Sequence, residues 1–222
     1  MKKRTDKGMF NTHEGLANKV KSDGSYVPFY GSTVVFAADS RCMSSVEKMQ
    51  AALHSEIGDM LASPLPVTSF HMTLHDLISP EMSASAPSDV EAYAREVEES
   101  HAKAVEIVDE IKKEYAGQKI VMDADRVVNM VSKSLVLLLR PHSEADYGLL
   151  LEMYRRFDGI VRLPYKLTPH ITLAYYRPGR IDGDRLGAAV DGVQVLIDNA
   201  DSYVFAAEAL AAQIFRDMQT YI

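Results

Sequence analysis

The sequence has a single cysteine, Cys42, among its 222 residues. One cysteine excludes an internal disulfide and any metal site built from several cysteines, and it fits a reducing cytoplasm. No apolar run approaches the roughly 18 residues that a membrane-spanning helix needs, and the basic start of the chain lacks the apolar segment of a secretory signal. We therefore expect a cytoplasmic protein with no membrane partner.

Positive charge is also scarce. The chain has 24 Lys and Arg against 31 Asp and Glu, which gives a net charge of −7. Residues 1–22 hold six of the basic and two of the acidic residues, so the other 200 residues sum to −11. A body this acidic is poorly suited to binding a long phosphate backbone, because that affinity comes from released counterions. Long nucleic acid is therefore disfavoured, whereas a small anionic ligand in a local pocket is compatible with the charge.

What the sequence does contain is the composition of a globular protein, with 47% hydrophobic and 25% charged residues. Apolar periodicity, helix caps and chain breakers predict an irregular N-terminal arm over residues 1–31, then strands and helices in alternation. Predicted strands cover residues 32–37, 70–76, 120–122, 127–131, 134–140 and 169–176, with a last extended run near 203–215. Predicted helices begin near residues 44, 88, 143 and 184, and a breaker-rich loop covers 77–88.

Two short stretches of the chain are nearly identical. His71-Met72-Thr73-Leu74 and His170-Ile171-Thr172-Leu173 both read His-x-Thr-Leu, with the histidines 99 positions apart. Successive side chains of a strand point to opposite faces, so each His shares a face with its Thr while the apolar residues point to a core. Each stretch therefore offers an imidazole beside a hydroxyl on a rigid strand.

The two motifs occupy matching places in a weak internal repeat. Strand 32–37, a helix and the first motif strand form one unit, and strand 134–140, a helix and the second motif strand form another. Val34 precedes His71 by 37 residues, and Val136 precedes His170 by 34. This order predicts two lobes, built around the 70–76 and 169–176 strands, with helices outside and both His-x-Thr faces turned to a shared cleft.

Two histidines and two threonines suffice for metal-free chemistry at phosphorus. One imidazole can act as a base and the other as an acid near neutral pH, while the hydroxyls donate to phosphoryl oxygens. A single His-x-Thr is common by chance and then marks a structural histidine; two copies in matching positions favour a site. We expect no cofactor, because this chemistry needs no further group. We also expect no metal: His71 and His75, on one face of the predicted strand, would lie about 13 Å apart, which is too far for both to bind one ion.

Tyr176 and Arg177 lie three and four residues after Leu173, the end of the second motif. Tyr176 shares the predicted face of His170 and Thr172, so it is a candidate to bind substrate by stacking or hydrogen bonding; a packed aromatic at the rim is the alternative. Arg177 falls at the end of the strand, where a cleft mouth would lie. There it is either an anion contact or part of a solvated turn.

With both motifs in view, the chain resembles the 2H phosphoesterase superfamily, the LigT-like group of cyclic phosphodiesterases, whose members carry two His-x-[Ser/Thr]-hydrophobic motifs. The resemblance covers roughly residues 32–216, and the arm is similar to a less characterised branch of the superfamily. It implies an α/β (α+β) fold that is bilobal and pseudo-symmetric, with two mostly antiparallel sheets facing a central cleft, as a single domain over residues 1–222. It also implies that His71 and His170 are the acid–base pair and Thr73 and Thr172 the phosphate-oxygen donors.

The resemblance further implies a metal-independent phosphodiesterase that acts on a small nucleotide or a short RNA end, often a 2′,3′-cyclic phosphate. Two alternatives are a nucleotide- or RNA-end-binding module without turnover and a 2′-5′ RNA ligase-like activity, which is chemically the reverse reaction. The sequence does not assign the acid and base roles to individual histidines, and it sets no oligomeric state.

Overall fold

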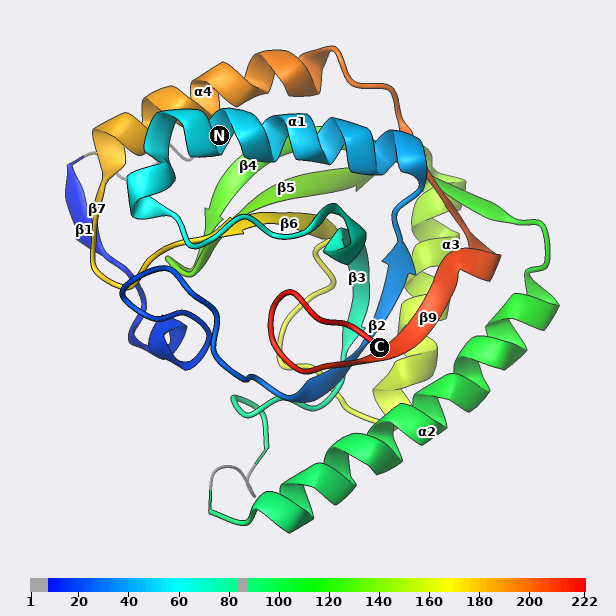
Figure 1. The fold of residues 1–222 in the computed structure, drawn as a ribbon. Coiled ribbons are helices and arrows are strands. Elements are labelled where there is room, and N and C mark those ends of the chain that lie inside the picture. Colours follow the sequence, from blue (N-terminus) through cyan, green and yellow to red (C-terminus); the bar gives the residue numbers. More distant parts are fainter. Residues whose placement is uncertain (1–7, 84–87) are drawn as a thin grey trace.

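The computed structural model describes residues 8–83 and 88–222 as a mixed α+β protein with antiparallel sheets (Figure 1). Residues 1–7 of the expected arm and 84–87 of the expected loop lie outside this description. The strands are β1 (Met9–Asn11), β2 (Gly31–Ala37), β3 (His71–Asp76), β4 (Lys119–Met130), β5 (Ser134–Pro141), β6 (His170–Tyr175), β7 (Arg180–Asp182), β8 (Tyr203–Ala206) and β9 (Leu210–Phe215). The α-helices are α1 (Ser40–Ile57), α2 (Val90–Glu114), α3 (Glu144–Arg155) and α4 (Gly183–Asp198).

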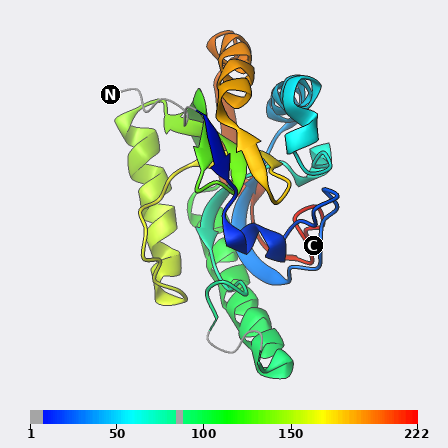
Figure 2. The same cartoon turned by 90° about the vertical axis from the view of Figure 1, so that its left-hand side faces the viewer.

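The strands form two larger sheets and a ribbon. One sheet has the order β3-β2-β9, the other has the order β6-β5-β4-β8, and the ribbon pairs β1 with β7. Helices α1 and α4 pack on each other and over β6 and β4, whereas α2 covers β9 and β2 and α3 reaches β3 (Figure 1 and Figure 2). The helices therefore lie on the outer faces, which leaves the inner faces of the sheets for a cavity.

A continuous core joins the two larger sheets. Its buried side chains come from all four helices and both sheets, and Phe36 of β2 packs against Phe205 of β8 with 5.9 Å between ring centroids. Burial of apolar surface is the main stabilising force in such a core. No helix within the described ranges is long and apolar enough to cross a membrane.

Helix α1 begins four residues before its predicted start. The capping-box spacing predicts a cap at Ser44, but Asp39 caps the helix by accepting a hydrogen bond of 2.7 Å from the Cys42 amide. A carboxylate at this position also interacts favourably with the helix dipole. The predicted start of α3 near residue 143 is confirmed, because Ser143 caps the helix by accepting a hydrogen bond of 3.2 Å from the Asp146 amide.

Two strand predictions need correction. The segments predicted at 120–122 and 127–131 belong to one strand, β4, because a β-bulge between Ala124 and Arg126 lets the ladder with β5 continue through polar residues. The run predicted at 203–215 is divided: the 3-10 turn η5 (Ala207–Ala209) carries the chain from β8 in one sheet to β9 in the other. This crossing links the sheets at one side, and β3 and β6 meet at the other.

Candidate active site

The two His-x-Thr stretches lie side by side as the edge strands of different sheets. β3 ends the three-stranded sheet and β6 ends the four-stranded sheet, and the two strands contact each other without pairing in a ladder. A cavity of about 610 Å³ between the sheets is lined by His71, Thr73, His170 and Thr172. The four residues that the sequence singles out therefore share one cavity, with a volume typical of small-molecule sites.

A β-bulge follows the threonine in both motif strands. In β3 the register with β2 passes from Thr73 to His75 and skips Leu74. In β6 the register with β5 skips Leu173 in the same way. A bulge sets two residues opposite one, so the alternation of faces is broken beyond it. Both strands accordingly show the same order of half-buried and buried positions.

The bulge in β6 changes which tyrosine faces the cavity. Simple alternation places Tyr176 on the face of His170, but Tyr176 is fully buried and packs edge-on against Phe10 at 6.2 Å between ring centroids. Tyr175 lines the cavity instead. The predicted placement of Tyr176 beside the motif is therefore wrong, and Tyr175 occupies that position.

The bulge in β3 likewise changes which residue faces the cavity: Asp76 does so, and His75 does not. His75 is only 1% exposed and packs against the Tyr154 ring of α3, at 4.8 Å between centroids. Asp76 lines the cavity, and its carboxylate accepts a hydrogen bond of 2.6 Å from the Tyr165 hydroxyl. His71 and His75 therefore do not share a face. Across residues 8–83 and 88–222, no three His, Cys, Asp or Glu side chains are grouped to hold a metal ion.

Arg177 lies away from the cavity. Its Nε donates to the Leu61 carbonyl oxygen at 2.7 Å, and its main-chain amide donates to the Met60 carbonyl oxygen at 2.9 Å. The guanidinium also lies against Gly24 of the N-terminal arm, where an added Cβ would come within 2.8 Å of Nε. Arg177 therefore anchors the arm against the turn that follows α1, and its predicted place at the cleft mouth is wrong.

Both motif histidines are held by the main chain two residues before them. His71 Nδ1 lies 2.8 Å from the Ser69 carbonyl oxygen, and His170 Nδ1 lies 2.7 Å from the Thr168 carbonyl oxygen. A carbonyl oxygen only accepts, so each Nδ1 carries a proton and each Nε2 is left for acid–base work. The two imidazoles are thus oriented by the same local contact on two different strands.

The surroundings of His71 favour its neutral form. Burial lowers the pKa of His71 to about 4, and nearby His170 acts in the same direction, against the opposing effects of the Ser69 hydrogen bond and Asp76. The Tyr221 ring packs on the imidazole with 4.7 Å between centroids. An imidazole that is neutral at pH 7 is suited to accept a proton.

Three lysines that were not predicted as site residues line the cavity wall. Lys19 comes from the N-terminal arm, Lys133 from the turn between β4 and β5, and Lys166 from the segment before β6. Glu81 pairs with Lys133 at 2.7 Å and with Lys19 at 3.9 Å. No motif marks these residues, and the basic composition of residues 1–22 was the only signal that pointed toward one of them.

The turn between β4 and β5 carries backbone strain at the cavity wall. Val131 and Ser132 have φ angles of 45° and 54°, and the Lys133 amide donates to the Met130 carbonyl oxygen at 3.0 Å. This left-handed region suits Gly or Asn, and other residues lose roughly 1–2 kcal/mol there. Val131 is β-branched and 67% exposed, so little burial offsets the strain.

Replacing Val131 with Asn should raise the melting temperature by roughly 2–4 °C. Asn tolerates the left-handed region, and relief of about 1 kcal/mol produces a shift of that size in a protein of this length. Ser132→Gly should act in the same direction, because glycine adopts positive φ readily. Thermal unfolding followed by circular dichroism measures both variants. A lower melting temperature for Val131→Asn would contradict the inference that the positive φ of Val131 destabilises the folded protein.

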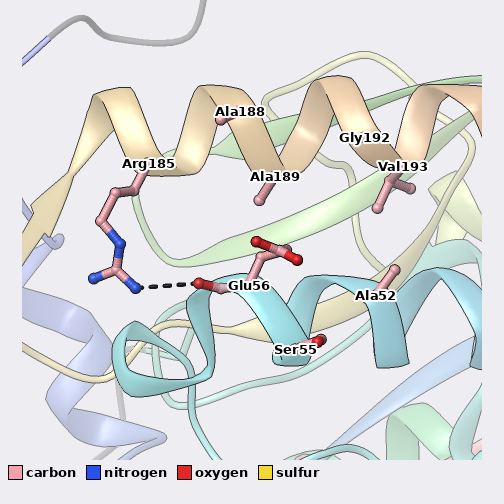
Figure 3. A pocket seen from close by; sticks show the side chains of 8 residues that line it. All are labelled: Ala52, Ser55, Glu56, Arg185, Ala188, Ala189, Gly192 and Val193. Carbon is pink, nitrogen blue, oxygen red and sulfur yellow. Dashed lines mark hydrogen bonds between the residues drawn. The ribbon is translucent and has the colours of Figure 1, made fainter.

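A second hollow, of about 490 Å³, lies between α1 and α4 (Figure 3). Arg185 Nη2 donates to the Glu56 carbonyl oxygen at 3.1 Å at one end, and small side chains such as Ala52 and Ala189 line the rest. The hollow contains no imidazole and none of the motif residues. It is a groove between two packed helices.

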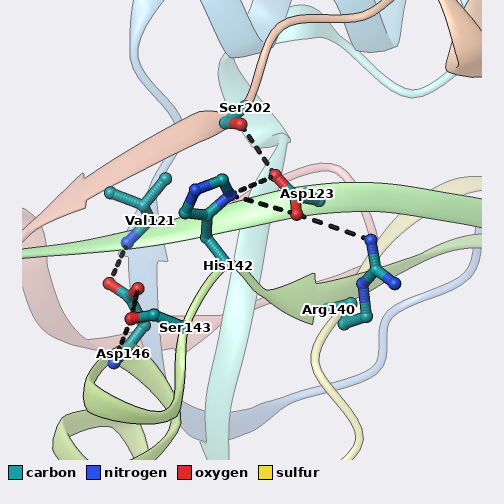
Figure 4. A network of polar contacts seen from close by, with 7 residues as sticks. All are labelled: Val121, Asp123, Arg140, His142, Ser143, Asp146 and Ser202. Atoms are coloured by element: carbon teal, nitrogen blue, oxygen red, sulfur yellow. Dashed lines mark hydrogen bonds and ion pairs between the residues drawn. The ribbon is translucent and has the colours of Figure 1, made fainter.

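A polar network away from the cavity joins β4, β5 and the start of α3 (Figure 4). Asp123 accepts hydrogen bonds from Ser202 Oγ at 2.7 Å and from His142 Nδ1 at 3.0 Å. The carboxylate separates the hydroxyl from the imidazole, so the imidazole cannot take the serine proton as it does in a Ser-His-Asp triad. The contacts tie strand ends together.

The fold and the cavity define an α+β protein in which two antiparallel sheets bring paired His and Thr side chains together. A scan of known protein families and a search of curated proteins give no match. Among solved structures, the chain is similar to a conserved protein of unknown function, ATU0111, from Agrobacterium tumefaciens str. C58. The TM-score is 0.64 over 96% of this chain and 91% of that chain, at 18% sequence identity. At this identity the likeness concerns the fold alone.

Proposed function

We propose that the protein is a metal-independent phosphodiesterase of the 2H type, which opens a 2′,3′-cyclic phosphate on a small nucleotide or short RNA end. One observation carries the proposal: two imidazoles, each fixed through Nδ1, share a cavity with two threonine hydroxyls. The matching bulges of β3 and β6 support the bilobal, pseudo-symmetric arrangement expected for that class.

In the proposed reaction His71 is the base and His170 the acid. The oxygen of water bonds to phosphorus as one P–O ester bond breaks; His71 Nε2 takes the proton from water, and His170 Nε2 gives a proton to the leaving oxygen. The Thr73 and Thr172 hydroxyls donate to the nonbridging oxygens, where charge develops. The products are a phosphomonoester and a free hydroxyl. The lowered pKa of His71 favours this assignment.

The walls of the cavity favour a nucleoside as the group that carries the phosphate. Aromatic rings line the cavity from several elements: Phe29, Tyr154, Tyr165, Tyr175 and Tyr221. Stacking of a base on an aromatic side chain contributes about 1–3 kcal/mol and tolerates different bases. The rings therefore support a nucleotide substrate without selecting the base.

The test is hydrolysis of 2′,3′-cyclic mononucleotides with EDTA present, measured as kcat/KM from about pH 3.5 to pH 9. We expect turnover without added metal and an ascending limb near pH 4, because His71, with its pKa lowered to about 4, must lose its proton to act as the base. The two limbs of the profile report apparent values of the pair. An ascending limb between pH 6 and 7 would contradict the assignment of His71 as the base. Strict dependence of turnover on added metal would contradict the proposed metal-independent reaction.

Circular dichroism at each pH separates catalysis from unfolding. The pKa of His71 is lower in the folded state, about 4, than the ordinary 6.5, so the unfolded chain binds more protons between these values. This contribution to stability is therefore complete above pH 6.5 and declines as the pH falls toward 4. Tight binding of cyclic nucleotides without turnover, in a folded protein, would favour the binding-module alternative.

A further inference from the structure

Two lysines share one carboxylate on the cavity wall. Glu81 Oε1 lies 2.7 Å from Lys133 Nζ, and Glu81 Oε2 lies 3.9 Å from Lys19 Nζ. The lysine side chains are each 16% exposed, and Lys19 Nζ also lies 4.5 Å from the centroid of the Phe29 ring. On the cavity wall as a whole three lysines, Lys166 being the third, face the two carboxylates of Glu81 and Asp76, which leaves one positive charge in excess.

The excess charge is costly in the free protein. Burial lowers the pKa of Lys19, and Lys133 adds to that effect while Glu81 and Asp76 oppose it. A partly buried charge without a full partner is unfavourable unless an ion or hydrogen-bonding group compensates it. The chain as a whole carries a net charge of −7, so this local surplus runs against its general composition. A bound anion would compensate it.

The lysine pair belongs to the same cavity as the motif residues but comes from other elements. Lys19 follows the 3-10 helix η1 (Glu14–Asn18), and Lys133 ends the turn after β4. Lys19 interacts electrostatically with Asp76, the last residue of the first motif strand, whereas His71 is the first residue of that strand. The lysines therefore belong to a part of the cavity wall that other segments supply, beside the strands that carry the histidines.

We propose that Lys19 and Lys133 bind a second anionic group of the substrate, a phosphate monoester carried by the same nucleotide. The inference rests on the proposed function, because the first anionic group is the phosphodiester held at the His-x-Thr pairs. The preferred substrate is then a nucleotide that bears a cyclic phosphate and a further phosphate. A nucleoside cyclic phosphate without that group would leave the lysine pair uncompensated.

Two measurements on the wild-type protein test the inference separately from the reaction. Isothermal titration calorimetry compares adenosine 3′,5′-bisphosphate with adenosine 3′-monophosphate, ligands that differ by one phosphate and need no turnover. Hydrolysis assays compare adenosine 2′,3′-cyclic phosphate with its 5′-phosphorylated form. We expect the additional phosphate to tighten binding roughly tenfold, the usual scale for one charge-assisted contact, and to lower KM similarly.

Variants of Lys133 and Glu81 should shift the preference for the bisphosphate over the monophosphate in opposite directions. Lys133→Gln removes one ammonium and should reduce the preference for the bisphosphate several-fold. Glu81→Gln removes the competing carboxylate and should increase it. Lys48→Gln changes the net charge as Lys133→Gln does, but Lys48 is an exposed residue of α1 outside the cavity, so the preference should stay at the wild-type value.

The outcomes separate the two proposals. Equal affinity for both ligands in the wild type, or an unchanged preference in folded Lys133→Gln, would overturn the second anion site even if cyclic phosphates are hydrolysed. A clear preference that Lys133→Gln lowers and Glu81→Gln raises would support the site even if neither cyclic ester is opened, in which case the proposed reaction fails instead.

Discussion

Replacing either His71 or His170 with alanine should lower kcat for a 2′,3′-cyclic nucleotide by about 10²- to 10⁴-fold, the usual contribution of one general acid or base. Each substitution removes an imidazole that lines the cavity, and the strand with its β-bulge should remain, because the ladder is formed by main-chain groups. KM should change little, because the threonines and the aromatic walls remain. Steady-state kinetics with EDTA present measures both parameters.

The combination of the two substitutions provides a sharper test. When two groups act in one proton-transfer sequence, the effects of their substitutions on kcat do not add. The double variant His71→Ala/His170→Ala should therefore be little slower than the slower single variant. His101→Ala is the matched control, because His101 lies on α2 and not on the cavity wall; its kinetics should be those of the wild type. Single variants that retain more than about a tenth of wild-type kcat would contradict acid–base catalysis by this pair.

Replacing Gly31 with alanine should lower the free energy of unfolding by about 3 kcal/mol, at the upper end of the usual cost of overpacking. Gly31 is the first residue of β2 and pairs with Phe215 of β9. An added Cβ would lie 2.4 Å from Phe215 Cζ and 2.5 Å from the Ile78 carbonyl oxygen. The second of these atoms is main chain, so a side-chain rotation alone cannot relieve the contact.

The loss should appear as a fall in melting temperature of roughly 6–12 °C, given about 2–4 °C per kcal/mol for a chain of this length. Activity should fall as well, because β2 pairs with β3 and Phe215 lines the cavity. Gly148→Ala is the control: Gly148 lies in α3, and apart from its chain neighbours and the backbone of its own helix no atom lies within 4 Å of an added Cβ, so the helix should gain up to about 1 kcal/mol. A melting temperature for Gly31→Ala equal to that of the wild type would contradict the inference that Phe215 and the Ile78 main chain leave no room for a side chain at position 31.

Local sequence patterns located the motif strands and most of the other elements. The His-x-Thr stretches are strands because their apolar residues alternate, and alternation depends only on backbone geometry within one segment. The start of α3 near residue 143 was predicted as well, and the cap that Ser143 provides there depends on contacts within three residues. The placement of four side chains in one cavity follows from the same alternation, once the two strands are set at neighbouring sheet edges.

The positions after the motifs required the tertiary structure. Alternation alone placed His75 and Tyr176 beside the motifs, whereas the structure places Asp76 and Tyr175 there. The cause is a bulge after each threonine, and a bulge is defined by register against a neighbouring strand rather than by the strand's own residues.

The sequence by itself thus determined the two His-x-Thr strands and the acidic balance of the chain, a net charge of −7. The tertiary structure alone decided which residues after the motifs face the cavity and which charges surround the imidazoles. Lys19, Glu81 and Lys133 meet on the cavity wall from segments more than 50 positions apart. Contacts of this kind leave no local pattern, because they arise only when distant segments pack around the same core.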